Sequence, residues 1–283
     1  MKVVTIATDH NHHLERLLVS ARHFGIDIIQ LGKGRKYKSH NDKTRWLLEY
    51  FEGLDDDEIV LYTDGYDSVF LSDLKYIERE FLAMNHPFVM GTEQNFNCDA
   101  SPLAKLDFYL SYPKGKKPYR FLNAGGYIGR VGYVRDMLLR VEKDGENDQD
   151  MLNQYYSKNH GTIKLDHDQK IFSCIAGRSG MEDHDYMLDA DGKIRNTVTG
   201  SYPAILHAAG KNFYGLYKVI SQLGFFPEET FNEREIKQYE KSRFWNKLTA
   251  HTTRDNYLFH AILKAVVVIG FGVTLYSLIS LIY

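Results

Sequence analysis

Short apolar runs alternate with segments of helical spacing along the first third of the chain. Residues 3–7 form a run rich in β-branched side chains, which predicts a buried strand. Residues 14–23 place apolar side chains at the three- and four-residue spacing of a helix. This alternation predicts an α/β fold with a mostly parallel, mixed sheet that helices cover on both faces. The other elements expected in this part are strands at 26–31, 58–63 and 87–91 and helices at 43–51 and 73–84.

The pattern becomes less regular in the middle of the chain and then resumes. Residues 92–119 are rich in proline and lysine, so we expect a long loop with room for one short helix. Residues 121–129 predict a strand that the pair Gly125–Gly126 interrupts, and the pair permits close approach of a ligand to the backbone. The remaining expected elements are helices at 134–141 and from 148, and strands at 162–166 and 204–207.

The last segment of the chain is apolar on every face. Residues 265–283 contain no charged side chain, and the apolar stretch extends back to Tyr257 with only His260 and Lys264 as interruptions. About 20 apolar residues in a helix span the hydrocarbon core of a bilayer, so we expect a transmembrane helix at 257–283. The alternative is a buried C-terminal helix of a soluble protein.

The predicted organisation is a domain at 1–226, a basic helical linker at 227–256 and a single-pass C-terminal anchor at 257–283. Basic residues before the anchor favour a domain on the cytoplasmic side of the membrane. The N-terminus has only a short apolar run, unlike a signal peptide, so we expect the domain to fold where it is synthesised.

Composition narrows the classes of protein. The chain has 283 residues and a formal net charge of -2, from 35 Lys and Arg against 37 Asp and Glu. Without a net basic charge to attract phosphates, nucleic acid is not an expected partner. The hydrophobic share of 43% excludes a wholly disordered chain. Two cysteines, Cys98 and Cys174, cannot form a disulfide framework.

An acidic turn, Asp64-Gly65-Tyr66-Asp67, follows the strand expected at 58–63. Two carboxylates this close can hold a hard divalent cation such as Mg²⁺ or Mn²⁺. A cation held in this way also offsets charge on a diphosphate leaving group. The plainer alternative is a polar turn or a helix N-cap, because Asp is favoured at both.

A second candidate follows the strand expected at 204–207. This strand ends at His207, and Gly210 and Lys211 come soon after. Imidazole suits Mn²⁺ as a third ligand, and Lys211 can place a point charge on a phosphate. The alternative is an ordinary strand-end histidine and a solvated lysine. Both candidates lie beyond the carboxyl ends of strands, where open α/β sheets bind ligands.

Several stretches of the sequence match one family in the same order. They are Thr5-Ile6-Ala7-Thr8, the turn from Asp64 to Asp67, Phe121-Leu122-Asn123-Ala124-Gly125-Gly126-Tyr127-Ile128-Gly129, Asp148-Gln149-Asp150, Leu165-Asp166-His167, Leu206-His207 and Gly210-Lys211. With this set the chain resembles the glycosyltransferase domain of procollagen lysyl hydroxylases and related GT-A type sugar transferases. The resemblance covers roughly residues 3–226 and implies a Rossmann-like nucleotide-sugar-binding domain, a UDP-sugar donor and a protein or glycan acceptor.

The resemblance also implies roles for individual residues. It implies Mn²⁺, or Mg²⁺, held by Asp64, Asp67 and His207. Lys43 matches a lysine near the donor, although Ser39-His40-Asn41-Asp42 stands where the family has glycines. The positions implied to bind the donor are Ala7, Thr8, Lys43, Asp64, Tyr66, Asn123, Gly125, Gly126, Gly210 and Lys211.

Three residues are expected to act in the reaction. Lys211, together with the metal, is expected to stabilise charge on the departing UDP. Asp148 and Asp150 are candidates for binding sugar hydroxyls or orienting the acceptor. The alternative is that both are ordinary acidic residues in the first turn of a helix, where the helix dipole stabilises their negative charge. Asp166 and His167 are further candidates, and a zinc site at His10, His12 and His13 is not favoured.

The predicted function is that of a metal-dependent enzyme moving glucose or galactose from a UDP-sugar to a hydroxyl of hydroxylysine or a glycan. One alternative is a catalytically inert, membrane-anchored module that binds nucleotide sugars. Another is a metal-dependent phosphoesterase or nucleotidyltransferase, which would usually need a second metal and more ligands. A dinucleotide enzyme is not expected, because no G-x-G-x-x-G follows the first strand.

Overall fold

The computed structural model describes residues 1–98, 101–114, 118–142, 147–175, 185–209 and 213–227, with isolated positions beyond them. Most of the predicted linker and anchor, 227–256 and 257–283, lies outside the described residues, as do Gly210 and Lys211. Within the described part of the chain, no helix is long and apolar enough to cross a membrane. The transmembrane helix therefore stays a prediction.

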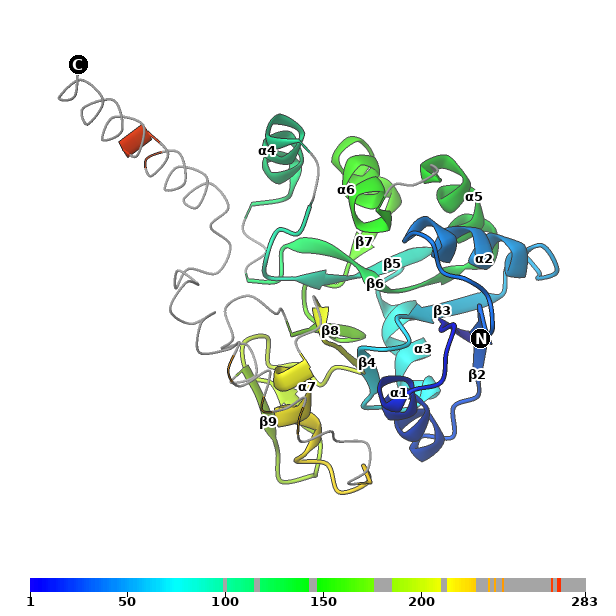
Figure 1. The fold of residues 1–283 in the computed structure, drawn as a ribbon, viewed down its shortest axis with the longest axis vertical. Coiled ribbons are helices and arrows are strands. Elements are labelled where there is room, and N and C mark those ends of the chain that lie inside the picture. The colour runs from blue at the N-terminus through cyan, green and yellow to red at the C-terminus, as the bar shows by residue number, and fades with distance from the viewer. Residues whose placement is uncertain are drawn as a thin grey trace, which may run out of the picture.

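A six-stranded sheet forms the centre of the molecule (Figure 1). The strand order is β2-β1-β3-β6-β5-β7. Strand β1 runs parallel to β2 and β3, and β5 runs parallel to β7. Strand β6 is antiparallel to both of its neighbours, β3 and β5. The predicted mixed, mostly parallel sheet is confirmed. The strands are β1 (Lys2–Ile6), β2 (Ile28–Leu31), β3 (Ile59–Thr63), β5 (Phe88–Glu93), β6 (Phe121–Arg130) and β7 (Lys164–Leu165).

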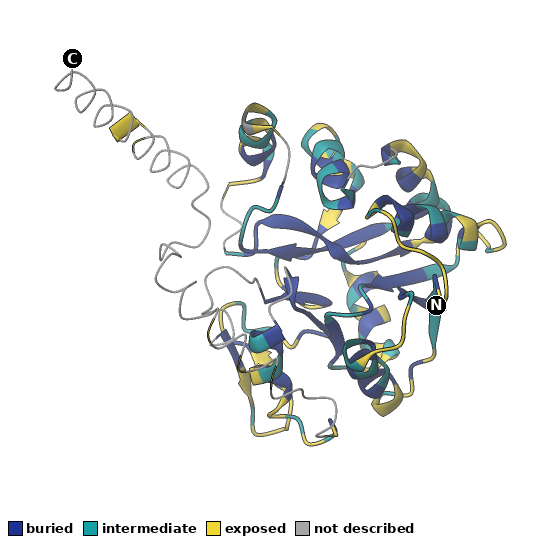
Figure 2. Cartoon of the chain, viewed as in Figure 1, coloured by how far each residue is buried: buried dark blue, intermediate teal, exposed yellow. Residues whose placement is uncertain are grey.

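Helices cover both faces of this sheet, because alternate strand residues point to opposite sides. On one side Val4 and Tyr62 pack with α2 (Asn41–Phe51), α5 (Val131–Val141) and α6 (Asp148–Lys158). On the other side Val3 and Leu61 pack with α1 (His12–His23) and α3 (Leu74–Ala83). The central strands β1, β3, β6 and β5 are consequently buried along almost their whole length, as their dark blue colour in Figure 2 shows.

A second, three-stranded sheet lies beside the first. In it β11 (Ile205–His207) pairs antiparallel with β4 (Ser68–Phe70) and parallel with β8 (Phe172–Cys174). Helix α7 (Phe213–Ile220) packs on this sheet, and a hairpin of β9 (Tyr186–Leu188) and β10 (Ile194–Asn196) lies next to it. The strand predicted at 204–207 is confirmed, whereas β4 and β8 were not predicted.

Two predictions for the middle of the chain have different outcomes. The expected short helix is present as α4 (Pro102–Ser111), which Ser101 caps. A short 3₁₀ helix, η1 (His160–Thr162), precedes β7. The expected break at Gly125–Gly126 is wrong, because β6 continues through both glycines and pairs with β3 up to Thr63. The irregularity lies instead on the facing strand, between Met90 and Thr92.

Candidate functional site

The acidic turn joins the two sheets. Asp64 directly follows β3, and its backbone N–H donates to the carbonyl oxygen of Gly125 at 2.9 Å. Asp67 directly precedes β4, and its carbonyl oxygen accepts the N–H of Ala208 at 2.7 Å. A Cβ added at Gly65 would lie 2.8 Å from the last carbonyl oxygen of β1, so only glycine lets the turn pass this close to β1. Both aspartates are therefore fixed by their backbones.

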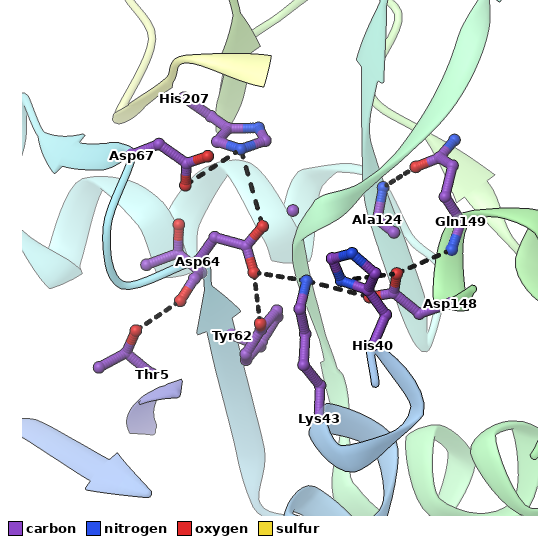
Figure 3. Close-up of polar contacts among 12 residues, drawn as sticks. Thr5, His40, Lys43, Tyr62, Asp64, Asp67, Ala124, Asp148, Gln149 and His207 are labelled. Atoms are coloured by element: carbon purple, nitrogen blue, oxygen red, sulfur yellow. Dashed lines mark hydrogen bonds and ion pairs between the residues drawn. The ribbon is translucent and has the colours of Figure 1, made fainter. Parts of the chain in front are cut away.

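Three candidate ligands converge at this turn (Figure 3). The Nε2 atom of His207 lies 3.4 Å from Oδ1 of Asp67 and 3.8 Å from Oδ2 of Asp64. One ligand atom from each residue lies within 4.8 Å of the others. The structure thus brings together all three predicted metal ligands, although His207 is remote from the aspartates in the sequence.

The donor set fits a divalent cation. Oδ1 of Asp67 is buried and makes no hydrogen bond of ordinary geometry among the described residues, although it lies 3.4 Å from Nε2 of His207. Two carboxylates and one imidazole can together ligate a divalent metal ion.

His207 is held in a charged, buried environment. Its side chain is 7% exposed. Burial opposes a charge on the imidazole, but Asp67 and then Cys174 outweigh it and raise the pKa of His207 well above its ordinary value. The Sγ atom of Cys174 lies 3.3 Å from Nδ1, on the opposite side of the ring from the carboxylates.

Lys43 bridges the aspartates of two elements. From α2, its ammonium lies 3.0 Å from Oδ1 of Asp64 and 3.1 Å from Oδ2 of Asp148 (Figure 3). Burial opposes the charge, but Asp148 and then Asp64 raise the pKa of Lys43 well above its ordinary value. The hydroxyl of Tyr62 also donates to Oδ1 of Asp64 at 2.5 Å. Burial raises the pKa of Asp64, but Lys43 and then His207 outweigh it, so the pKa is lowered.

The loop before Lys43 is shaped by an aspartate. The carboxylate of Asp42 accepts backbone N–H groups from Lys38 at 2.6 Å and from Ser39 at 3.0 Å. These bonds turn the chain into α2. Lys43 consequently reaches the site from a helix that begins at Asn41.

The predicted nucleotide-binding residues gather at the carboxyl end of β1. The carbonyl oxygen of Ala7 accepts Nε2 of Gln30 at 2.9 Å. The hydroxyl of Tyr66 accepts the N–H of Asp9 at 3.0 Å and lies 3.5 Å from the hydroxyl of Thr8. Ala7, Thr8 and Tyr66 are thus brought together beside the acidic turn.

Asn123 is committed to partners within the protein. Its amide nitrogen donates to Oε1 of Glu93 at 2.9 Å, and its amide oxygen accepts the N–H of Gly125 at 2.9 Å. Glu93 and Asn123 are both buried. The geometry shows that Asn123 shapes the backbone next to His207, whereas donor binding by this residue stays a prediction.

The two glycines of β6 make room for protein rings. A Cβ added at Gly125 would lie 2.7 Å from both ring nitrogens of His207, and one at Gly126 would overlap the ring of Phe172. Both glycines thus let side chains of the second sheet approach the backbone of β6 closely. The structure leaves direct donor contacts of Gly125 and Gly126 as predictions.

Helix α6 brings its first turn against the site. Asp148 contacts Lys43, and the side-chain oxygen of Asn147 caps the helix through the N–H of Gln149. Gln149 in turn accepts the N–H of Ala124 at 2.8 Å and so ties α6 to β6. Asp150 lies in the same first turn. Asp148 can therefore both interact with the helix dipole and take part in the site, so the two hypotheses for this residue are compatible.

The weaker candidates have structural surroundings. The carboxylate of Asp166 accepts three backbone N–H groups at residues 170–172, and burial raises its pKa to about 6. The ring of His167 lies 2.8 Å from the carbonyl oxygen of Tyr119. His10 pairs with Glu15 at 3.1 Å. Among the described residues, Asp64, Asp67 and His207 are the only group placed to hold a metal ion.

Comparison with known proteins identifies the family. The model of the PLOD GT domain matches residues 1–234. The chain belongs to the PLOD glycosyltransferase-domain family. The predicted family and the predicted glycosyltransferase class are thereby confirmed.

Curated relatives of this PLOD-type domain are longer proteins. A multifunctional procollagen lysine hydroxylase and glycosyltransferase of Caenorhabditis elegans is 30% identical over 252 residues, which cover 78% of this chain and 33% of the relative. Procollagen-lysine,2-oxoglutarate 5-dioxygenase 2 of Mus musculus is 26% identical over 237 residues, which cover 76% of this chain and 31% of the relative. The chain thus spans about a third of the length of these relatives.

Solved structures similar to this PLOD-type domain include two sugar transferases. A glycosyltransferase involved in glycosylation of the major capsid of PBCV-1 has a TM-score of 0.45 and 8% identity, over 78% of this chain and 97% of that chain. Mouse xyloside xylosyltransferase 1 has a TM-score of 0.44 and 11% identity, over 75% of this chain and 98% of that chain.

Two residues of the candidate site were missed by sequence reasoning. Tyr62 carried a usable signal, because it stands two positions before Asp64, and residues i and i+2 of a strand share a face. Cys174 carried none, because its contact with His207 depends on the pairing of β8 with β11.

Proposed function

We propose that the chain is a metal-dependent glycosyltransferase that moves a hexose, glucose or galactose, from a UDP-sugar to a hydroxyl acceptor on hydroxylysine or a glycan. The observation that carries the proposal is the convergence of Asp64, Asp67 and His207 at the ends of strands from two sheets. The names of the C. elegans relative and of a rat relative, which include glycosyltransferase activity, support the class of reaction.

Asp64, Asp67 and His207 are the residues proposed to hold the cation. A bound Mn²⁺ or Mg²⁺ supplies positive charge to the diphosphate of the leaving UDP. Lys43 adds a second positive charge beside Asp64 and holds Asp148 within 3.1 Å of its ammonium. Because these groups are fixed before the substrate arrives, they need little reorganisation during the reaction.

The donor is proposed to lie along the carboxyl edge of the main sheet. Ala7, Thr8 and Tyr66 form the end of this edge where β1 meets the acidic turn, and they are proposed to contact the nucleotide. The sugar is then proposed to lie toward Asp148 and Asp150, whose carboxylates can accept hydrogen bonds from sugar hydroxyl groups. Gly210 and Lys211 are proposed to contact the diphosphate on sequence grounds alone.

The test replaces Asp67 with alanine. UDP release from UDP-glucose and UDP-galactose is measured with Mn²⁺, with a hydroxylysine peptide or a glycan as the acceptor. We expect Asp67→Ala to lose more than the roughly 10–100-fold that a change in an outer-shell partner of a metal costs. Binding of Mn²⁺ in the presence of UDP is measured alongside by electron paramagnetic resonance.

Asp27→Ala is the matched control, because Asp27 is exposed and precedes β2, at the amino edge of the parallel strands. Full UDP release by Asp67→Ala would contradict the metal assignment. Mn²⁺-dependent UDP binding by the wild type without turnover on any acceptor would instead favour the inert nucleotide-sugar-binding alternative.

We also propose that residues 257–283 anchor the domain in a membrane on its cytoplasmic side, which would give it an acceptor at that membrane. The proposal rests on the absence of charged residues from 265 to 283. Extraction of membranes with carbonate tests it: the full chain should remain in the pellet, and a chain ending at 256 should be released. Release of the full chain would refute the anchor.

A further inference from the structure

The imidazole of His207 is enclosed on several sides. Its Nε2 edge faces Asp67 and Asp64, and its Nδ1 edge faces the sulfur of Cys174 at 3.3 Å. The backbone of Gly125 lies so close to the ring that a Cβ there would overlap it. The ring therefore has little freedom to choose which nitrogen faces the carboxylates.

Cys174 is held in place as firmly as the ring. It pairs directly with His207 in the register of β8 and β11, and the N–H of Ile175 donates to the carbonyl oxygen of His207 at 2.8 Å. The backbone N–H of Cys174 donates to Oε1 of Gln169 at 3.1 Å. Its side chain is buried, with the residue 1% exposed. The sulfur thus occupies a fixed position beside Nδ1.

We propose that Cys174 is a positioning residue of the metal site: its sulfur accepts the N–H of Nδ1 of His207, so that the lone pair of Nε2 is directed at a divalent cation between Asp64 and Asp67. The inference rests on the proposed function, since it assigns a supporting role toward the cation placed there. A histidine that binds a metal through one nitrogen commonly donates its other N–H to a fixed acceptor, and this bond sets the tautomer.

A thiol in this position differs from the usual carboxylate or carbonyl acceptor. Neutral sulfur is a weak acceptor that adds no negative charge to a site already containing Asp64, Asp67 and Asp148. Because both Cys174 and His207 are buried, bulk water cannot replace the sulfur beside Nδ1. Removal of the sulfur should leave Nδ1 without an acceptor and the ring less restricted.

The first experiment measures Mn²⁺ affinity of the full chain by electron paramagnetic resonance in the presence of UDP. We expect Cys174→Ala to raise the dissociation constant of Mn²⁺ about 10–100-fold, the range for loss of an outer-shell partner. Cys174→Ser should fall between it and the wild type, because a hydroxyl also accepts but lies farther from the ring. Cys98→Ala is the matched control, a second buried cysteine, near Tyr112, and should stay within twofold.

An unchanged dissociation constant in Cys174→Ala would overturn the proposal. A second measurement needs no variant: long-range ¹H–¹⁵N correlation spectra of the wild type with Mg²⁺ and UDP report which ring nitrogen of His207 carries the proton. A proton on Nδ1 supports the proposal, and a proton on Nε2 with Mg²⁺ bound overturns it. Failure of the wild type to bind Mn²⁺ would refute the metal site itself, an outcome distinct from equal binding by wild type and Cys174→Ala.

Discussion

Replacement of Gly125 with alanine gives a sharp test of the site, because the new methyl group would meet the ring of His207. An added Cβ would lie 2.7 Å from Nδ1 and from Nε2, and closer still to Cε1. Ordinary van der Waals contact begins at 3.4 Å, so the ring nitrogens must move by about 0.7 Å or more. The alternative movement, of Gly125 itself, is opposed by its carbonyl oxygen, which accepts the N–H of Asp64 at 2.9 Å.

The magnitude follows from these two constraints. Overpacking of a buried site costs typically about 1–3 kcal/mol, and each kcal/mol lowers the melting temperature of a domain of this size by about 2–4 °C. Metal sites tolerate distance errors of only about 0.2 Å, so the displacement of Nε2 should affect metal affinity more than stability. We expect Gly125→Ala to remain folded and to lose at least about tenfold in Mn²⁺ affinity.

The assay measures the melting temperature by circular dichroism and the Mn²⁺ dissociation constant on the same preparation. Gly53→Ala is the control, because a Cβ at Gly53 meets nothing within 4 Å. Wild-type Mn²⁺ affinity in Gly125→Ala would refute the reasoning, since it would mean that His207 can leave its observed position without consequence. A large loss of stability with unchanged affinity of the folded fraction would refute it as well.

Two further predictions concern buried charges, those of Lys43 and of Asp166. Lys43→Met leaves Asp64 and Asp148 without the ammonium that they share, so the free energy of unfolding at pH 7, measured with urea, should fall by about 3–5 kcal/mol. Added Mn²⁺ should stabilise this variant more than it stabilises the wild type. Burial raises the pKa of Asp166 from 3.8 to about 6, so between these pH values the folded state holds a proton that the unfolded state has lost. The contribution of this carboxyl to the free energy of unfolding therefore falls as the pH rises from about 4 to about 6. Asp166→Asn should remove that part of the pH dependence, while lowering stability overall because its amide N–H groups face backbone donors.

Controls for these predictions are exposed residues of the same type. Lys75→Met on α3 should change neither stability nor its response to Mn²⁺, and Asp107→Asn on α4 should leave the pH dependence unchanged. Equal stability of Lys43→Met and the wild type would contradict the bridging role of Lys43. A pH profile unaltered by Asp166→Asn would show that this carboxyl does not titrate in the expected window.

The sequence predicts the main sheet well because most of its strands and its helices are long enough to show a periodicity. Strand β4 has only three residues and β8 has three, so neither shows the alternation that identifies a strand. Their presence depends on β11, to which both are hydrogen bonded. The second sheet is thus specified by tertiary pairing, which a local pattern does not contain.

In the candidate site, too, the sequence indicates individual residues, whereas their contacts depend on the tertiary fold. The aspartates could be proposed from one turn and His207 from one strand end, but their convergence rested on a family resemblance until the fold placed them within 4.8 Å. Lys43 was assigned to the donor, whereas its contacts with Asp64 and Asp148 could not be seen from the sequence. Asp166 was a candidate for the site, and the structure shows that its carboxylate accepts backbone N–H groups of residues 170–172, which the sequence did not predict.

The arrangement of the ligands ties the site to the assembly of the fold. Asp64 directly follows β3 of the main sheet, Asp67 directly precedes β4 of the second sheet, and His207 ends β11 of that second sheet. Any cation held by all three would therefore link the two sheets, and part of its binding free energy would stabilise their contact. The glycines of β6 contribute to the same contact, because side chains at 125 and 126 would separate the sheets at His207 and Phe172. For this reason the two glycines and the three ligands are best understood as one structural unit, in which close packing of the sheets sets the geometry of the metal site.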